Sequence, residues 1–279
     1  MAHPPPKPLF IDETVTVHQG ADAASRLAAK NDLRFFEPGK GIARVDRARW
    51  EEAQRYEKRT WMDLNRGAVE DRNQVHAARF AGYEALAGRR FERAIELGCG
   101  PFTNLRLILE VADVGEVHLL DPLARDYLAH PGCRYRTGTL SAEPRHPGAR
   151  FRVGVGRPVT LEACAIEDYR PRGRFDLVVM VNVLEHCLDA EAVLRRVDEL
   201  VAPGGTFVFH DTFITPERLQ EVMSALYDAG HPIRLDRRLV GYFLAPRFEP
   251  RWHAEVYESE RCGDLELPLE LVYFVGTRR

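Results

Sequence analysis

Short apolar runs rich in β-branched residues alternate with amphipathic stretches over the last two thirds of the chain. The apolar runs cover residues 93–97, 116–120, 159–165, 176–181 and 206–210. Each run has the length and composition of a strand that is buried on both faces. Helical periodicity marks segments between them, at residues 101–112, 122–129 and 189–202. This alternation predicts a doubly wound α/β fold built around a mostly parallel sheet.

The end of the chain follows a different pattern. Residues 215–230 predict a helix, because Thr215 can cap its N-terminus and Gly230 can end it. Residues 238–246 and 267–279 then have the composition of two strands without a helix between them, which is typical of an antiparallel pair. We therefore expect a seven-stranded, mostly parallel sheet with an antiparallel C-terminal edge strand.

A mainly helical cap is predicted at residues 11–90, before a sheet domain at residues 91–279. One helix of the cap is expected to begin after Asp46, a favourable N-cap residue. Its residues spaced three and four apart share one face, namely Trp50, Gln54, Glu57, Trp61 and Leu64. The proline-rich residues 1–10 predict a disordered tail, and residues 132–158, rich in Arg, Gly and Pro, predict an insertion loop.

Composition and charge argue against several classes of partner. A formal net charge of −3 gives little support for binding nucleic acid, which favours a basic surface. No apolar run approaches the length of a membrane span, and the N-terminus lacks the hydrophobic stretch of a secretory signal. The five cysteines form no C-x-x-C pair, so neither a disulfide framework nor a zinc site is indicated. We expect a cytoplasmic protein without a metal, nucleic-acid or membrane partner, and the oligomeric state stays open.

A glycine-rich turn, "ELGCGPFTN" at residues 96–104, follows the first predicted strand. Gly98 and Gly100 allow close approach of the backbone to a ligand, but Thr103 stands where the dinucleotide-binding pattern G-x-G-x-x-G requires a third glycine. Asp121 ends the second predicted strand, where its carboxylate can accept hydrogen bonds from both hydroxyls of a ribose. The missing glycine favours S-adenosylmethionine (SAM), which carries no phosphate, over NAD.

Five segments, in this order, resemble the motifs of the class I SAM-dependent methyltransferases of the small-molecule type. They are "ELGCGPFTN", "LLDP", "CAIEDY", "FDLVVMVNVLEHCLD" and "LVAPGGTFVFHD". In that family the acid of the second motif binds the ribose, and Ile166 and Glu167 would flank the adenine. The resemblance implies a cofactor site made by Glu96, Gly98, Cys99, Gly100, Asn104, Asp121, Pro122, Ile166, Glu167, Asn182 and Val183. We expect the N-terminal helix to add Trp61 and, from beside its predicted face, Tyr56.

The same resemblance implies transfer of a methyl group to an oxygen or nitrogen atom of a small molecule, with natural products and sugars among the candidates. The product of the donor would be S-adenosylhomocysteine (SAH). A general base is needed only where the acceptor must lose a proton. His210 is the first candidate for this base and His186 the second, because both lie near the ends of strands where the acceptor is expected.

Two other functions fit parts of the pattern. A non-catalytic, regulatory SAM-binding protein would share the fold and the cofactor motifs. An NAD(P)-dependent oxidoreductase would be expected to carry the third glycine and a catalytic Tyr–Lys pair, and no lysine follows Lys58. A nucleic-acid methyltransferase is disfavoured by the acidic balance, and "NVLE" stands where amino-methylating DNA enzymes carry N/D-P-P-Y. The acceptor itself is not identified.

Overall fold

The structure, a computed structural model, describes the chain in six stretches. These are residues 14–19, 43–64, 72–142, 156–213, 229–262 and 265–279. The predicted tail at residues 1–10 and nearly all of the predicted helix at residues 215–230 lie outside the described residues, as does much of the predicted loop at 132–158.

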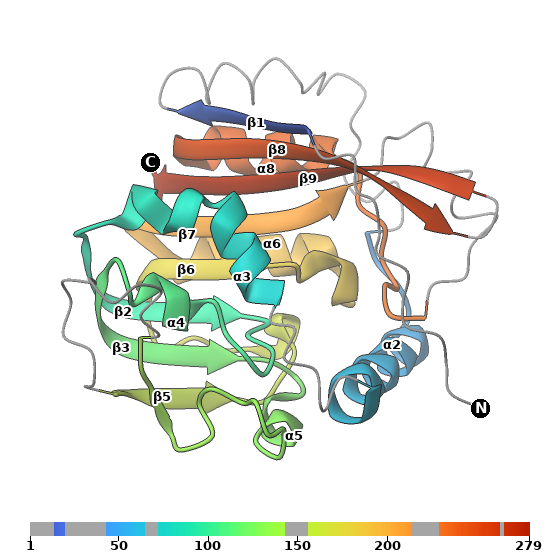
Figure 1. Cartoon of the computed structure of the whole chain (residues 1–279), viewed down its shortest axis with the longest axis horizontal. Helices are drawn as coiled ribbons and strands as arrows, with labels where there is room; N and C mark the ends of the chain where they lie inside the picture. The colour runs from blue at the N-terminus through green and yellow to red at the C-terminus, as the bar shows by residue number, and fades with distance from the viewer. Residues whose placement is uncertain (1–13, 20–42, 65–71, 143–155, 214–228, 263–264) are drawn as a thin grey trace.

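A sheet of nine strands, counted within the described residues, runs through the molecule in the order β1-β8-β9-β7-β6-β2-β3-β5-β4 (Figure 1). The strands are β1 (Thr14–Gln19), β2 (Arg90–Leu97), β3 (Asp113–Leu120), β4 (Thr139–Leu140), β5 (Arg157–Glu162), β6 (Phe175–Val181), β7 (Val201–Phe213), β8 (Phe248–Cys262) and β9 (Leu265–Arg278). Five neighbouring strands, from β5 to β7 in the sheet order, are parallel. β9 is antiparallel to both β7 and β8, and β1 is antiparallel to β8.

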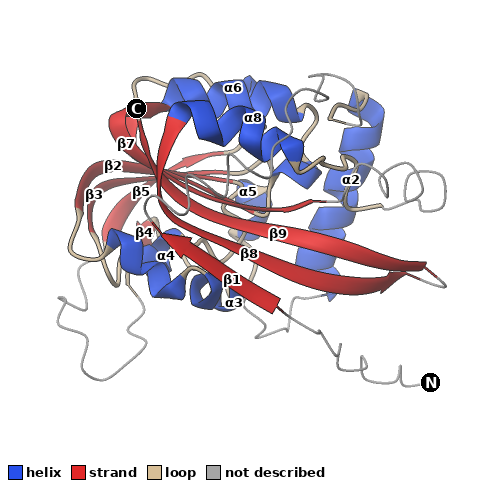
Figure 2. Ribbon diagram, turned by 90° about the horizontal axis from the view of Figure 1, so that it is seen from above, coloured by secondary structure: helices blue, strands red, loops and turns tan. Residues whose placement is uncertain are grey.

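Helices cover both faces of this sheet. Figure 2 shows α6 and α8 on one face, and α3 and α4 on the other. The α-helices are α2 (Arg47–Arg59), α3 (Arg72–Arg79), α4 (Leu105–Ile108), α5 (Ala124–Tyr127), α6 (Ala190–Leu200) and α8 (Arg238–Arg247). A short π-helix lies at Thr60–Leu64, and short 3-10 segments lie at Ala81–Leu86, which is kinked, Ile166–Asp168 and Leu184–His186. Among the described helices, none combines the length and apolar character needed to cross a membrane.

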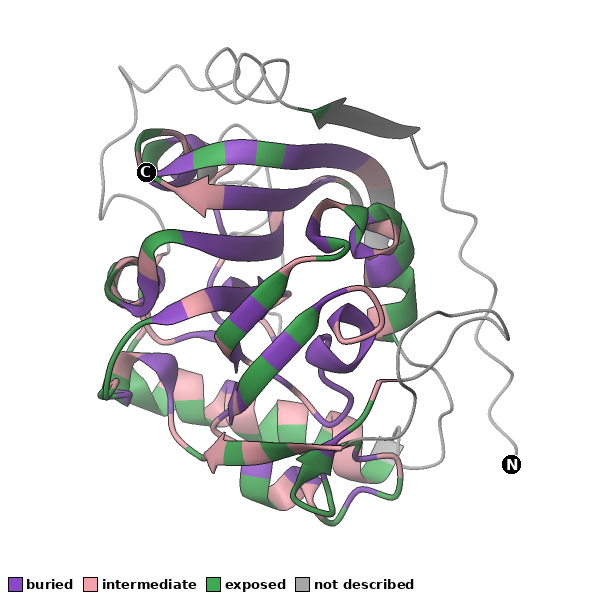
Figure 3. Cartoon of the chain, turned by 90° about the vertical axis from the view of Figure 1, so that its left-hand side faces the viewer, coloured by how far each residue is buried: buried purple, intermediate pink, exposed green. Residues whose placement is uncertain are grey.

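The two-layered core follows from the alternation of side chains along β6. Val178 and Met180 pack into a cluster on the side of α6 and α8, whereas Leu177, Val179 and Val181 pack into a cluster on the side of α3 and α4. A strand with apolar side chains on both faces is stable only where helices cover both, so the apolar run at β6 requires this layering. Figure 3 shows that buried residues dominate the strands at the centre of the sheet.

The predicted α/β fold is confirmed, and the sheet is wider than the seven strands expected from the sequence. The C-terminal strand β9 is not the edge strand, because β8 pairs with its other side and β1 pairs with β8. The predicted strand at residues 238–246 is wrong: these residues form helix α8. One face of that helix is buried, and it carries Leu239, Phe243 and Leu244. Leu239 and Phe243 are four residues apart, a spacing typical of a helix, but the β-branched and aromatic composition of the segment favoured a strand.

Other elements differ from prediction mainly in length. The predicted helices at residues 101–112 and 122–129 shorten to α4 and α5, of four residues each. The helix predicted at 189–202 is confirmed as α6, which Asp189 caps by accepting the N–H of Ala192 at 2.9 Å. Asp46 caps α2 as predicted, accepting the N–H of Arg49 at 2.8 Å.

The register of the parallel strands sets the position of the functional groups. Leu97 at the end of β2 lies between Leu120 of β3 and Met180 of β6. The residues that follow these strands therefore meet at one edge of the sheet, where ligands bind in folds of this kind.

Replacement of Val178 by Ala tests the packing of the central strand. Val178 is fully buried, so Val178→Ala should lower the free energy of unfolding by about 2 kcal/mol through lost burial and the cavity left behind. Val75→Ala is the matched control, because Val75 is 52% exposed on α3 and its loss should change stability by less than about 0.5 kcal/mol. Urea denaturation measures both, and equal effects would contradict the assignment of Val178 to the core.

Candidate functional site

The glycine turn leaves β2 in a left-handed conformation. Gly98 and Gly100 have φ values of +67° and +53°, and the N–H groups of Gly98 and Cys99 both donate to the carbonyl oxygen of Leu120, at 2.7 and 3.2 Å. These conformations favour glycine. A Cβ at Gly100 would meet no protein atom within 4 Å, because this residue faces open space at the edge of the sheet.

The Glu96 carboxylate holds the turn from beneath. It accepts hydrogen bonds from the Thr103 hydroxyl, from the backbone and side-chain N–H groups of Asn104 at 2.8 and 2.9 Å, and from the N–H of Leu105 at 3.1 Å. Burial raises the pKa of Glu96, and the four donors oppose this rise. Asn104 in turn accepts the hydroxyl proton of Tyr83 at 3.1 Å. The structure therefore places Glu96 as a support of the turn.

Asp121 follows β3 and joins the turn to the neighbouring strand. Its two carboxylate oxygens accept the N–H of Gly100 at 3.1 Å and the N–H of Leu123 at 2.8 Å. Burial raises the pKa of Asp121 to about 6, opposed by these two hydrogen bonds, and the nearby carboxylates of Glu57 and Glu96 add to the rise. The carboxylate lines a cavity at this edge of the sheet, so it can accept hydrogen bonds from a bound polyol.

Ile166 and Glu167 form a short helical turn after β5. Ile166 is buried and its side chain belongs to the core on the side of α6. The Glu167 carboxylate accepts the N–H groups of Leu188 and Asp189, at 2.9 and 3.0 Å. Both residues line the cavity, and Glu167 also fixes the segment that leads into α6.

The segment after β6 also carries a left-handed residue. Asn182 has a φ of +59°, and its N–H donates to the carbonyl oxygen of His210 at 2.9 Å. The next two amides, of Val183 and Leu184, donate to the Asp211 carboxylate at 3.2 and 2.7 Å. Burial and the nearby Glu185 raise the pKa of Asp211. Asp211 thus orders the backbone that brings Asn182 and Val183 to the cavity.

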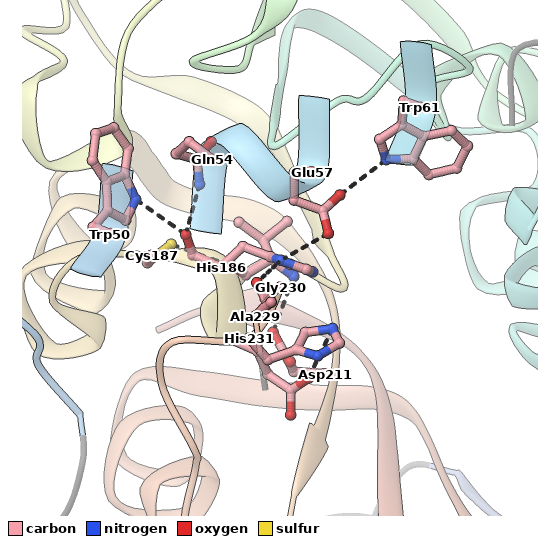
Figure 4. Close-up of polar contacts among 12 residues, drawn as sticks. Trp50, Gln54, Glu57, Trp61, His186, Cys187, Asp211, Ala229, Gly230 and His231 are labelled. Atoms are coloured by element: carbon pink, nitrogen blue, oxygen red, sulfur yellow. Dashed lines mark hydrogen bonds and ion pairs between the residues drawn. The ribbon is translucent and has the colours of Figure 1, made fainter. Parts of the chain in front are cut away.

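Helix α2 closes over the same edge (Figure 4). The ring N–H of Trp50 and the amide of Gln54 both donate to the backbone carbonyl of His186, each at 3.1 Å. Trp61 donates to the Glu57 carboxylate at 3.1 Å. The predicted face of the helix therefore contacts the sheet edge.

His186 has one nitrogen fixed by the backbone. Its Nδ1 lies 3.1 Å from the carbonyl oxygen of Gly230 and 3.6 Å from the Glu57 carboxylate (Figure 4). A carbonyl can only accept, so Nδ1 carries the proton in the neutral ring, and Nε2 keeps the lone pair. In this tautomer Nε2 can accept a proton, and Glu57 would stabilise the resulting imidazolium.

His210 occupies a different environment. It is buried, its Nδ1 donates to the carbonyl oxygen of Val272 at 3.0 Å, and its ring stacks on Tyr273 with centroids 4.0 Å apart. Burial lowers the pKa of His210 well below its usual range, and His76 and Arg79 add to this effect. The residue does not line the cavity. This geometry gives less support to His210 as the base than to His186.

A cavity of about 320 Å³ opens at this edge of the sheet. The predicted site residues that line it are Tyr56, Trp61, Gly98, Cys99, Gly100, Asn104, Asp121, Pro122, Ile166, Glu167, Asn182, Val183 and His186. Glu96 and His210 do not line it. The roles of all these residues in binding and catalysis stay predictions.

Several lining residues were missed by sequence reasoning. Helix α3 brings Arg72, Asn73 and His76 to the cavity, and Phe102 and His231 line it elsewhere. Arg72 and His76 are four residues apart and so share a helix face, which the sequence could have indicated. Among the described residues, no three His, Cys, Asp or Glu side chains are grouped to hold a metal ion.

Comparison with known families gives a match over most of this region. A model of the family described as "Methyltransferase domain" matches residues 68–249, more than half of the chain. The match contains the glycine turn, Asp121 and the segments that follow β5, β6 and β7.

Curated relatives match over part of their length. The "Ubiquinone biosynthesis O-methyltransferase" of Bradyrhizobium sp. (strain ORS 278) is 28% identical over 167 residues, covering 53% of this chain and 55% of that protein. The protein of the same name from Rhodopseudomonas palustris (strain HaA2) is 25% identical over 166 residues, with the same coverage. The chain spans about half the length of the curated relatives it matches.

Solved structures show the same fold at low sequence identity. The YcgJ protein from Bacillus subtilis is 12% identical, with a TM-score of 0.53, over 74% of this chain and 99% of that chain. The DhpI–SAM–HEP complex is 18% identical, with a TM-score of 0.50, over 82% of this chain and 99% of that chain. Both solved structures thus share the α/β fold of this chain.

Replacement of Gly98 tests the packing of the turn against the segment after β6. A Cβ at Gly98 would lie 2.5 Å from a methyl carbon of Val183, in a backbone conformation with φ of +67°. Gly88 has a similar φ of +73°, but a Cβ there would meet no atom within 4 Å, so Gly88→Ala isolates the backbone strain. Gly98→Ala should therefore lose about 1–3 kcal/mol more free energy of unfolding than Gly88→Ala, by urea denaturation.

Val183→Ala in the Gly98→Ala background should restore part of that loss, because it removes the methyl groups that clash. Equal destabilisation by the two glycine substitutions, without any rescue, would contradict the contact between the turn and Val183.

Proposed function

We propose that this chain, which belongs to the methyltransferase-domain family, transfers a methyl group from SAM to an oxygen or nitrogen atom of a small molecule. The observation that carries the proposal is the cavity at the carboxyl edge of the sheet, where the Asp121 carboxylate lies beside the left-handed glycine turn. This arrangement offers an acidic acceptor for ribose hydroxyls at a place that a backbone can approach closely.

The residues present fit SAM and its product SAH. Asp121 can accept both ribose hydroxyls, and Gly100 leaves open space where a side chain would intrude. Ile166 supplies an apolar surface next to the polar Glu167, as expected beside an adenine. Trp61 and Phe102, whose rings meet edge to face with centroids 5.7 Å apart, add apolar surface to the cavity. We propose contacts of the cofactor with these residues.

When bound, SAM supplies an electrophilic methyl group on a sulfonium sulfur. The contribution of the protein is to align the acceptor and to exclude water, which alone can account for a large part of the rate. Helix α2 serves this purpose by closing over the edge through Trp50 and Gln54. For an acceptor that must lose a proton, we propose His186 as the base, with Glu57 stabilising its charged form.

The two curated relatives are named for O-methylation, and this favours oxygen over nitrogen as the acceptor atom. The cap at residues 11–90, the cytoplasmic location and the absence of nucleic-acid and metal partners stay predictions.

Titration calorimetry with SAH and with NADH tests the proposal. We expect SAH to bind and NADH not to bind, and failure of SAH to bind would overturn the proposal. Transfer of tritium from methyl-labelled SAM to a panel of phenols, hydroxy acids and amines then separates an enzyme from a regulatory protein. A regulatory SAM-binding protein would bind SAH and label no member of the panel.

Asp121→Asn should weaken SAH binding by about tenfold or more, equivalent to about 1.4 kcal/mol, because the amide can no longer accept both ribose hydroxyls as a charged group. Asp113→Asn is the matched control, since Asp113 lies at the opposite end of β3 on the surface. Calorimetry measures both affinities. Unchanged affinity in Asp121→Asn would remove this residue from the cofactor site.

The pH dependence of SAH binding gives a second measurement on the same residue. The pKa of Asp121 is raised to about 6, so the group takes up a proton as the pH falls through that value and loses its charge. SAH affinity should therefore decrease from pH 7 to pH 5 in the wild-type protein. This decrease should be smaller in Asp121→Asn, and an identical profile in both proteins would contradict the assignment.

His186→Gln should lower kcat by about a hundredfold or more with acceptors that lose a proton, and should change SAH affinity little. His118→Gln serves as control, because His118 lies on β3 and does not line the cavity. The rise of kcat with pH that reports the base should disappear in His186→Gln. Full turnover with an unchanged pH profile would show that His186 is not the base.

A further inference from the structure

His76 lines the cavity beside strand β7, which is separated from β3, the strand before Asp121, by β6 and β2. Along the edge of the sheet, Asp121 follows β3, Gly98 follows β2, Asn182 follows β6, and His210 belongs to β7. The ring of His76 lies 4.6 Å from that of His210, between centroids. On the proposed function, with the ribose at Asp121, His76 therefore faces the acceptor.

A chain of hydrogen bonds through Arg79 and Tyr273 ends at His76. Arg79 donates through one nitrogen to the Glu258 carboxylate and through another to the Tyr273 hydroxyl, the latter at 3.1 Å. Tyr273 and Nδ1 of His76 are 3.0 Å apart. An arginine can only donate, so the Tyr273 oxygen accepts from it. A hydroxyl oxygen can accept twice, and the arrangement on which the proposal rests is the one in which Tyr273 donates its own proton to Nδ1 of His76. In the neutral ring, Nε2 then carries the proton.

The environment keeps this ring neutral. Burial lowers the pKa of His76 to about 4, and the positive charges of Arg79 and Arg72 add to the effect. Within the described residues, Nε2 has no hydrogen-bond partner, and it is not among the buried polar atoms left unpaired. In the tautomer with the proton on Nε2, this N–H is available to a molecule in the cavity.

Arg72 adds a positive charge to the same end of the cavity. It lies one helical turn before His76 on α3, lines the cavity, and makes no ion pair within the part of the chain that the structure describes. The carboxylates that line the cavity, those of Glu57, Asp121 and Glu167, come from α2 and from the segments after β3 and β5.

We propose that His76 donates its Nε2–H to an oxygen atom of the methyl acceptor, and that this end of the cavity selects neutral or anionic oxygen compounds against protonated amines. The proposal rests on the proposed function and narrows it, because a protonated amine would face the N–H of His76 and the guanidinium of Arg72. Tyr273 acts through His76, as a positioning residue that fixes which nitrogen carries the proton.

Nitrogen-15 NMR of the histidine rings tests the proton position without any turnover. In the SAH complex at neutral pH, we expect His76 to be neutral with the proton on Nε2, the signal being assigned by its loss in His76→Gln. Tyr273→Phe should shift the ring toward the other tautomer, because Nδ1 loses its donor. A proton on Nδ1, or a charged ring at neutral pH, would overturn the proposal.

Two phenols of similar size and opposite charge test the selectivity. 4-Hydroxybenzoate and 4-hydroxybenzylamine are titrated into the SAH-loaded protein, and we expect the anion to bind about tenfold tighter or more. His76→Phe and Arg72→Gln should each reduce this preference, and His76→Gln, whose amide still donates, should keep part of it. Val75→Ala on the exposed face of α3 is the control and should leave the preference unchanged.

Equal binding of the two probes, preference for the amine, or binding of neither at millimolar concentration would each overturn the proposal. SAH affinity is measured in every variant. Failure of the wild-type protein to bind SAH would count against the proposed function, whereas intact SAH binding without the expected selectivity would count against the role of His76 alone.

Discussion

The buried carboxylate of Glu96 holds the turn on which the rest of the site depends. It gathers four donors from three successive residues, and without them its burial would strongly disfavour the charged form. Thr103, with a φ of +50°, takes a conformation that is uncommon for a residue other than glycine. Its hydroxyl donates to Glu96, a bond that a glycine at this position could not make. The residue that breaks the dinucleotide-binding pattern thus contributes to the turn.

The backbone of this turn also fixes the positions of the segments that follow the neighbouring strands. The N–H of Gly100 donates to Asp121, so the shape of the turn and the direction of the carboxylate after β3 are set together. On the other side, a Cβ at Gly98 would clash with Val183, which limits the turn to glycine and brings it close to the segment after β6. Asp211 orders that segment through two amides. The edge of the sheet therefore acts as one connected unit.

The parts of this structure that follow from local pattern could be predicted from the sequence. The apolar runs located the parallel strands, and the glycine turn and Asp121 were found because their spacing from the strands is short and regular. The sequence predicted Glu96 as a cofactor residue, but its position beneath the turn depends on three-dimensional packing that no spacing reveals. Helix α8 was missed because its apolar residues also suit a strand. His76 was missed because only the packing of α3 against β7 and β9 brings it to the cavity.

Two histidines at the cavity show how a single partner determines what an imidazole can do. His186 has a carbonyl oxygen at Nδ1, which requires a proton there and leaves Nε2 as an acceptor. His76 has at Nδ1 a tyrosine hydroxyl that accepts from an arginine, and where this hydroxyl donates its own proton to Nδ1, Nε2 is the donor. A neutral imidazole has one nitrogen that accepts and one that donates a hydrogen bond. When the protein occupies Nδ1, only the function of Nε2 remains for the substrate, so a base and a donor must be different residues. With both Nδ1 atoms occupied by the protein, each ring can present only one of these functions to the cavity, and the two rings present opposite ones.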